Sequence, residues 1–199
     1  MSDLLAFARL GFAHILDPSA LDHVLFLVAL AVVYRPRDWP DALRVVTAFT
    51  VGHSATLALA ATGTLAPDAR LVEFLIPVTI VATAVENVAA RDRATTPRAW
   101  RWRPVLAGVF GLVHGAGFAG YLKSLFLADV VVPLLGFNLG IEVGQLVVLA
   151  AVAPALAGVV ALLRALAARA TPVHRWRVVA LSALVGVVAA AWAVERRPW

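Results

Sequence analysis

The sequence predicts an all-α fold, a polytopic membrane helix bundle of about six transmembrane helices with a broken first helix. Of its 199 residues, 62% are hydrophobic and 15% are charged, and the mean hydropathy is +0.88. A soluble domain of this size is much less apolar. Apolar segments of about 20 residues, the length that crosses a bilayer, recur along the chain. We therefore expect a single integral membrane domain over 1–199 that is surrounded by the lipid bilayer.

The first apolar segment is interrupted by Asp17-Pro18. Proline disfavours helical geometry in the residue before it but is common at the first position of a helix. We therefore predict a short helix that ends near Leu16, a turn, and a second helix from Pro18 to about Tyr34. Asp17 is the predicted N-cap of that second helix.

The remaining segments are nearly uninterrupted. Together with the first, they cover about residues 4–34, 43–62, 71–90, 104–126, 131–163 and 177–194. The fifth segment is longer than a bilayer requires, so we expect it to tilt, to kink near Pro154 or to project from the membrane.

The basic residues indicate how the chain is oriented. The loops after the first, third and fifth segments contain twelve arginines: Arg35, Arg37, Arg44, Arg91, Arg93, Arg98, Arg101, Arg103, Arg164, Arg169, Arg175 and Arg177. The other side has five basic residues: Arg9, Arg70, Lys123, Arg196 and Arg197. Cytoplasmic loops are enriched in Lys and Arg, so we place the arginine-rich loops inside and both termini outside. This pattern explains the net charge of +5 without a nucleic-acid partner.

Several chemistries are excluded by composition. The chain has no cysteine, and its one methionine is Met1, so neither disulfides nor thiolate ligands are available. No Gly-rich phosphate-binding loop is present, which argues against transport driven by ATP within this chain. The N-terminus carries Asp3 and lacks the basic region of a secretory signal peptide, so we expect no cleaved leader.

The helix break carries His14, Asp17, Asp22 and His23 within an otherwise apolar stretch. Ionisable residues at membrane depth are costly and usually functional, and broken helices often form ion sites. A capped interfacial turn whose polar groups touch water is the alternative interpretation.

Further polar residues occur in later segments. Segment two has His53, segment three has Glu86 and Asn87, segment four has His114, and segment five has Asn138, Glu142 and Gln145. A lone buried histidine is usually a satisfied core residue, and the amides could be interhelical hydrogen bonds. Membrane Thr and Ser residues usually bond their own i−4 carbonyl, and His174, in an arginine-rich loop, is expected to be solvated. Several histidines and carboxylates together favour a cation site or pathway.

Glycines mark one face of the fifth segment. Gly136, Gly140 and Gly144 form a ridge opposite the polar stripe of that segment, and such ridges allow two helices to approach closely. We expect the similar ridge of Gly111, Gly115 and Ala119 to be the partner. Gly-rich faces could also hold a homo-oligomer together.

Four motifs in this order resemble the HupE/UreJ family. They are His14 with Asp22-His23 and Leu25-Phe26-Leu27, then Thr47-Ala-Phe-Thr-Val-Gly-His-Ser-Ala-Thr-Leu57, Gly111-Leu-Val-His-Gly-Ala-Gly-Phe-Ala119 and Gly136-Phe-Asn-Leu-Gly-Ile-Glu-Val-Gly-Gln-Leu146. The resemblance implies a bacterial inner-membrane permease for nickel or cobalt. It also implies metal binding by His14, Asp22 and His23 at an outer site and by His53, His114 and Glu142 deeper in the membrane. Asp17, Glu86, Asn138 and Gln145 are secondary candidates. Seven residues lie between His14 and Asp22-His23 in this chain, whereas we expect five between the first histidine and the Asp-His pair in members of the family.

The favoured function is therefore a secondary, non-ATP-driven permease whose substrate is a divalent metal ion, Ni²⁺, Co²⁺ or Zn²⁺. The first alternative is a membrane-embedded zinc hydrolase, in which histidines and an aspartate hold the metal and Glu86 or Glu142 acts as general base. The second alternative is a metal-sensing or assembly partner of a metalloenzyme.

Overall fold

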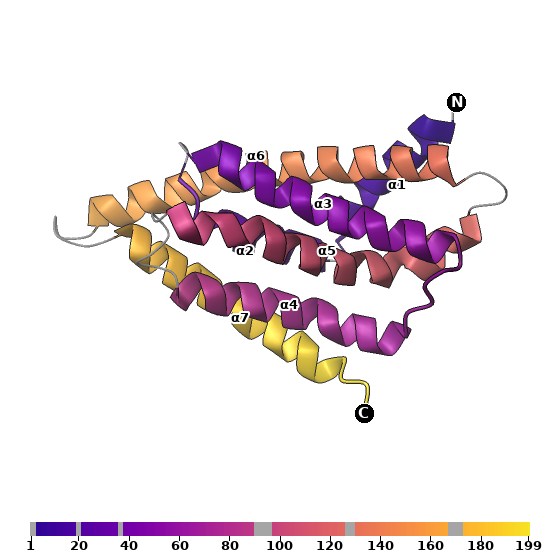
Figure 1. Cartoon of the computed structure of the whole chain (residues 1–199). Coiled ribbons are helices and arrows are strands. Elements are labelled where there is room, and N and C mark those ends of the chain that lie inside the picture. Colours follow the sequence, from indigo (N-terminus) through magenta and orange to yellow (C-terminus); the bar gives the residue numbers. More distant parts are fainter. Residues whose placement is uncertain (1–2, 19–20, 36–37, 90–96, 126–129, 167–172) are drawn as a thin grey trace.

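The computed structural model describes residues 3–18, 21–35, 38–89, 97–125, 130–166 and 173–199, and within these ranges it is all helical. The helices are α1 (Asp3–Leu16), α2 (Asp22–Ala31), α3 (Trp39–Ala61), α4 (Ala69–Ala89), α5 (Pro97–Leu125), α6 (Val131–Leu166) and α7 (Val173–Glu195). They run roughly side by side as a bundle (Figure 1). The predicted all-α membrane bundle is confirmed.

Four of these helices, α3, α4, α6 and α7, are long and apolar enough to cross a membrane. In contrast, α1 has 14 residues and α2 has 10, and each is shorter than the ~20 residues of a spanning helix. The chain is therefore an integral membrane protein, and its first segment is divided into two short helices as predicted.

The position of the break differs in detail from our expectation. The second helix begins at Asp22 and ends at Ala31, not at Pro18 and Tyr34. Its N-cap is Leu21, which makes no side-chain cap bond, so the prediction that Asp17 caps this helix was wrong. Tyr34 instead closes a final turn, in which its N–H donates to the carbonyl of Ala31 at 3.0 Å.

Two other boundaries also shifted. Helix α5 begins at Pro97 and runs through Pro104, seven residues before the predicted start. Helix α6 is one continuous helix of 36 residues that includes Pro154, and it extends beyond the other helices at one end (Figure 1). His174, expected to be solvated in a loop, lies half-buried in the first turn of α7, with Nδ1 3.0 Å from a guanidinium nitrogen of Arg177.

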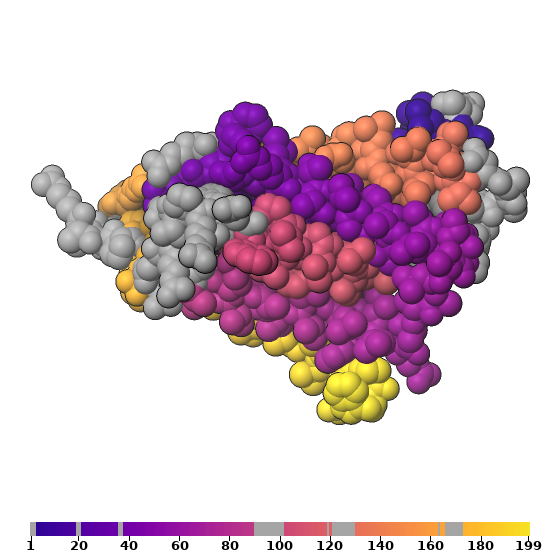
Figure 2. All heavy atoms as spheres, in the orientation of Figure 1, coloured from indigo at the N-terminus to yellow at the C-terminus, as the bar shows by residue number. Residues whose placement is uncertain are grey.

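The bundle consists of three helix pairs and a central short helix. Helix α1 packs along α6, α3 along α5, and α4 along α7, while α2 contacts members of all three pairs. Half of the residues of α2 are buried, including Phe26 and Leu27. In the space-filling view, α3, α4, α5 and α6 close over the interior on the face shown (Figure 2).

In two of these pairs, α1 with α6 and α3 with α5, glycines let the two helices of the pair approach closely. A Cβ atom added to Gly140 of α6 would overlap the carbonyl oxygen of Ala8 in α1, and one on Gly111 of α5 would overlap that of Phe49 in α3. The ridge of α6 is thus an interhelical contact, but its partner is α1. Our expectation that it pairs with the ridge of α5 was wrong, because that second ridge faces α3.

These contacts also bear on the expected homo-oligomer. Gly111 and Gly115 of α5 contact α3, and Gly136 and Gly140 of α6 contact α1, all within one chain. These glycine faces are therefore not free for a second copy.

Both termini lie at the same end of the bundle, where α3 ends and α4 begins (Figure 1). Helices α3, α5 and α7 begin at the opposite end, which carries Arg44, Arg103 and Arg177. The fold therefore separates the arginine-rich segments from the termini, as the charge pattern predicts.

Candidate metal site

Four histidines that lie far apart in the sequence meet inside the bundle. They are His14 of α1, His23 of α2, His53 of α3 and His114 of α5, which we call the histidine cluster. The ring centre of His23 lies 4.6 Å from that of His14, 6.0 Å from that of His53 and 5.5 Å from that of His114. His23 is therefore the central member.

Close helix packing brings these side chains together. His14 lies one turn after Gly11, and His114 lies one turn after Gly111. Added Cβ atoms on these glycines would overlap the carbonyl oxygens of Phe137 and Phe49, respectively. Small residues at these positions let the backbones approach, and the neighbouring imidazoles then point into one shared space.

The cluster is buried, and most of its nitrogens lack a partner. The exposed fractions are 6% for His23, 0% for His53 and 1% for His114. Among the described residues, neither ring nitrogen of His23 or His53 has a hydrogen-bond partner, and neither does Nε2 of His14 or His114. Buried polar atoms are normally paired, so a group of unpaired nitrogens calls for an explanation such as a bound ion.

A hydrogen bond orients the ring of His114. Its Nδ1 lies 2.9 Å from the carbonyl oxygen of Phe110. A carbonyl can only accept a hydrogen bond, so Nδ1 carries the proton and Nε2 keeps its lone pair. A backbone carbonyl that fixes the tautomer in this way is typical of metal-binding histidines.

Aromatic rings surround the cluster. The ring centre of Phe118 lies 4.1 Å from that of His14, and those of Phe26 and Phe49 lie 5.1 and 5.0 Å from that of His114. The surroundings are apolar, so the imidazoles are the polar groups that an ion would meet there.

The predicted carboxylates have other partners. Asp22 forms an ion pair with Arg196 at 3.0 Å, and Glu86 forms one with Arg103 at 2.9 Å. Glu142, on α6, accepts a hydrogen bond from Thr47 at 3.0 Å. The structure thus brings together the four histidines and engages these three carboxylates elsewhere.

The amides behave mainly as interhelical hydrogen-bonding groups. Asn87 donates to the carbonyl of Ala29 at 2.7 Å and to Ser182 at 3.2 Å. Gln145 accepts a hydrogen bond from Thr50 at 2.8 Å. The Oδ1 atom of Asn138 is buried and has no partner among the described residues. Hydroxyls bond back to their own helix as expected, for example Thr83 to the carbonyl of Thr79 at 2.9 Å.

Sequence reasoning missed three arginines that act inside the fold. Arg103 and Arg177 are each only 7% exposed, and Arg196 reaches Asp22 from just beyond α7. We had counted all three only as charges in loops or at the terminus. For Arg103 and Arg196 a signal was present, because a buried carboxylate favours a cationic partner and these two arginines pair with Glu86 and Asp22.

The cluster is not arranged as a finished metal site. Among the described residues, no group of three or more His, Cys, Asp or Glu side chains is in position to hold a metal ion. The rings are close, but their nitrogens do not converge on one point.

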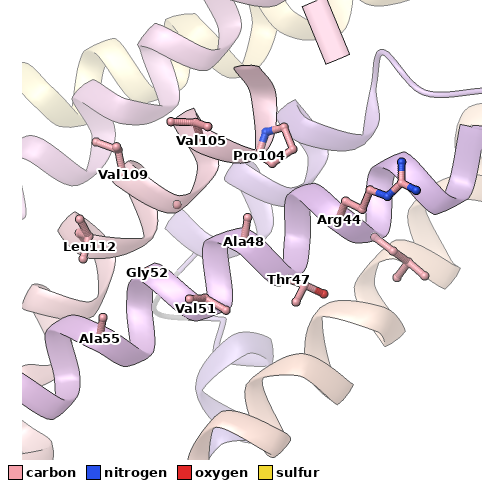
Figure 3. A pocket seen from close by; sticks show the side chains of 12 residues that line it. Arg44, Thr47, Ala48, Val51, Gly52, Ala55, Pro104, Val105, Val109 and Leu112 are labelled. Carbon is pink, nitrogen blue, oxygen red and sulfur yellow. The ribbon is translucent and has the colours of Figure 1, made fainter. Parts of the chain in front are cut away.

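A broad hollow lies elsewhere, between α3 and α5. It is an open groove of about 820 Å³ in which Arg44 and Thr47 are the polar side chains and Val51, Val109 and Leu112 are typical of the rest (Figure 3). An apolar groove on a membrane helix pair has the chemistry of a lipid-facing surface and not that of an ion site.

A family model described as "HupE / UreJ protein" matches residues 1–196. This family is associated with nickel or cobalt transport or with urease and hydrogenase maturation, and it is a transporter-like family and not an enzyme family. No curated protein and no solved structure matched the chain.

Proposed function

The chain belongs to the HupE/UreJ family, and from this premise we propose that it is a secondary permease for a divalent transition-metal ion, most specifically nickel or cobalt. One observation carries the proposal. The buried imidazoles of His23, His53 and His114 and the half-buried one of His14 lie within one space, and six of their nitrogens have no hydrogen-bond partner among the described residues. A cation that accepts imidazole ligands would satisfy one nitrogen of each ring.

The donor set supports this choice of ion. Imidazole suits nickel, cobalt and zinc, whereas Cu⁺ is selected by thiolate and thioether ligands. The chain has no cysteine and only Met1. Ni²⁺, Co²⁺ and Zn²⁺ are therefore the ions to test, and the metal is the transported substrate.

The spacing of the rings also supports a shared ion. Three imidazoles that bind one metal at about 2.1 Å have ring centres roughly 5 Å apart. The separations from His23 are 4.6, 6.0 and 5.5 Å. We propose that the rings rotate on binding, so that their nitrogens face one ion. A site that must be completed on binding is moderately tight, as transport requires, because the ion must also leave.

We assign the outer site to His14, Asp22 and His23, and the deeper ligands to His53, His114 and Glu142. The Asp22 carboxylate is paired with the Arg196 guanidinium at 3.0 Å. To bind the ion, Asp22 would release Arg196. Asp17, Glu86, Asn138 and Gln145 are secondary candidates. A concentration gradient or a cytoplasmic metal sink would drive transport.

We further propose that the protein lies in the bacterial inner membrane with both termini outside. The arginine asymmetry supports this orientation. Because the chain has no cysteine, single cysteines report position cleanly. An impermeant thiol reagent added outside should label Asp68→Cys and not Trp39→Cys, and the reverse pattern would overturn the orientation.

The decisive test of function is His23→Ala. Titration of the purified protein with Ni²⁺, Co²⁺ and Zn²⁺ should show loss of binding, because His23 touches the other three histidines. The matched control is His174→Ala, which removes a histidine bonded to Arg177 outside the cluster and should leave affinity unchanged. Wild-type affinity of His23→Ala for all three metals would refute the site.

Within the described part of the chain, no contact favours the alternative of a zinc hydrolase. The two proposed general bases, Glu86 and Glu142, are bonded to Arg103 and Thr47, respectively. A role in metalloenzyme maturation is compatible with a permease that supplies the metal.

A further inference from the structure

Three of the four helices that carry the histidine cluster also carry a phenylalanine one turn nearer to the arginine-rich end. The pairs are His23 and Phe26 on α2, Phe49 and His53 on α3, and Phe110 and His114 on α5. Residues three or four apart lie on the same face of a helix. Three helices therefore place an aromatic layer directly beneath the histidines.

The rings of this layer touch one another. The ring centres of Phe26 and Phe49 are 4.8 Å apart, and those of Phe26 and Phe110 are 6.2 Å apart. Phe26 and Phe49 are 0% and 1% exposed. The layer also meets the cluster, since Phe26 and Phe49 both pack on His114. Nothing polar in these rings could take an ion from the histidines.

A cavity of about 220 Å³ lies on the other side of Phe110. Leu30, Thr83, Glu86 and Arg103 contribute to its wall together with Phe110. The Glu86 side chain is 30% exposed, whereas that of Arg103 is 7% exposed. The carboxylate is thus the accessible charged group of the cavity.

We propose that Phe26, Phe49 and Phe110 form the closed inner gate of the permeation pathway, and that the cavity at Glu86 is the chamber into which the metal ion is released. This inference rests on the proposed function. An ion that moves from the histidine cluster toward the arginine-rich end meets the aromatic layer first and the Glu86 carboxylate next. A divalent ion cannot cross an apolar layer without ligands, so the layer must open.

Arg103 keeps the chamber neutral while no ion is present. Its guanidinium pairs with Glu86 at 2.9 Å and donates to Oδ1 of Asn87 at 2.7 Å. It also lies over the Tyr34 ring, 5.7 Å from its centre. When Glu86 turns to an arriving cation, Arg103 therefore retains two partners. The Glu86 carboxylate thus exchanges the Arg103 guanidinium for the metal ion. Because Arg103 competes for the carboxylate, the metal ion is bound weakly enough to be released.

The test is Phe110→Ala in the full-length protein in proteoliposomes that contain a Co²⁺-sensitive dye. Phe110 is half-buried and links the layer to the cavity. Its removal should raise the initial rate of Co²⁺ entry several-fold. The visible absorption of Co²⁺ bound to the purified protein should be unchanged, because the histidines remain. Phe74→Ala is the matched control, since that ring packs on Trp199 outside the layer, and it should not change the rate.

Glu86→Gln tests the chamber itself. Loss of the carboxylate should slow Co²⁺ entry. It should leave the absorption of Co²⁺ held by the histidines unchanged, because Glu86 lines the cavity beyond Phe110 and not the histidine cluster. If Phe110→Ala does not fold, Phe110→Leu should give a smaller increase in rate. Leucine is smaller than phenylalanine but larger than alanine, so it leaves a smaller opening in the layer and keeps it apolar.

The inference is overturned if the folded Phe110 variant transports at the wild-type rate, or if Glu86→Gln does so. Failure of the proposed function looks different. In that case the wild-type protein would show no Co²⁺ absorption that depends on His23, and the proposal of a gate would be refuted together with the permease function.

Discussion

The histidine cluster and the arginine network around α2 are both buried and polar, yet they are built in opposite ways. In the network, Arg177 donates to the carbonyl oxygens of Val32 and Tyr34 at 2.9 and 3.1 Å, and Arg196 pairs with Asp22. In the cluster, six nitrogens have no partner among the described residues. Each guanidinium of the network has at least one partner within the protein, whereas the rings of His23 and His53 have none among the described residues.

This difference separates structural groups from groups that can bind a substrate. Removing one member of a buried charge pair destabilises the fold, because the other charge is left uncompensated. An unpartnered buried nitrogen contributes nothing to stability and persists for another reason. The comparison therefore assigns the arginines to the scaffold and the histidines to the ion.

The network also shows how α2 is held. Arg177, in α7, binds carbonyls at the C-terminal end of α2, and Arg196, just beyond α7, binds Asp22 in its first turn. A cation at the C-terminus and an anion at the N-terminus both match the helix dipole. Helix α7 thus clamps at both ends the short helix that carries His23.

Arg103→Ala should have the largest effect on stability. It leaves Glu86 without its ion pair and removes a donor from Asn87. We expect a loss of about 2–3 kcal/mol in the free energy of unfolding, less than for a fully buried pair because Glu86 is 30% exposed. Thermal unfolding in detergent measures it, and Co²⁺ binding to the folded fraction should persist. A stable variant that has lost Co²⁺ binding would reverse the assignment.

His53→Leu should have the opposite profile. His53 is 0% exposed and makes no hydrogen bond among the described residues. Leucine has a similar volume and no unpaired polar atom, so stability should change by less than about 1 kcal/mol. Co²⁺ affinity should fall strongly. Unfolding and titration on one preparation give both quantities, and a large loss of stability would show that His53 has a structural partner.

The sequence was sufficient to predict the helical class and the broken first segment, because these follow from apolar length and proline. It also singled out the four histidines as costly polar residues, and their role in metal binding stays a prediction. The sequence was not sufficient to predict which helices pair. Gly136 and Gly111 both signal close contact, but a ridge does not identify its partner, so α1 was missed as the partner of α6. Arg196 was missed for the same reason, since its partner Asp22 lies 174 positions away in the chain.

A small effect on stability, and the sharpest on mechanism, should come from the pair of Asp22 and Arg196. The side chains are 14% and 32% exposed, so breaking the pair should cost about 1 kcal/mol by either Asp22→Asn or Arg196→Gln. Their effects on Co²⁺ should differ in sign. Asp22→Asn removes a ligand or orienting group of the outer site and should weaken binding about tenfold. Arg196→Gln removes the cation that competes for Asp22 and should strengthen binding. If both variants change stability alike and neither changes the affinity, Asp22 serves only to anchor α2, and the outer site consists of histidines alone.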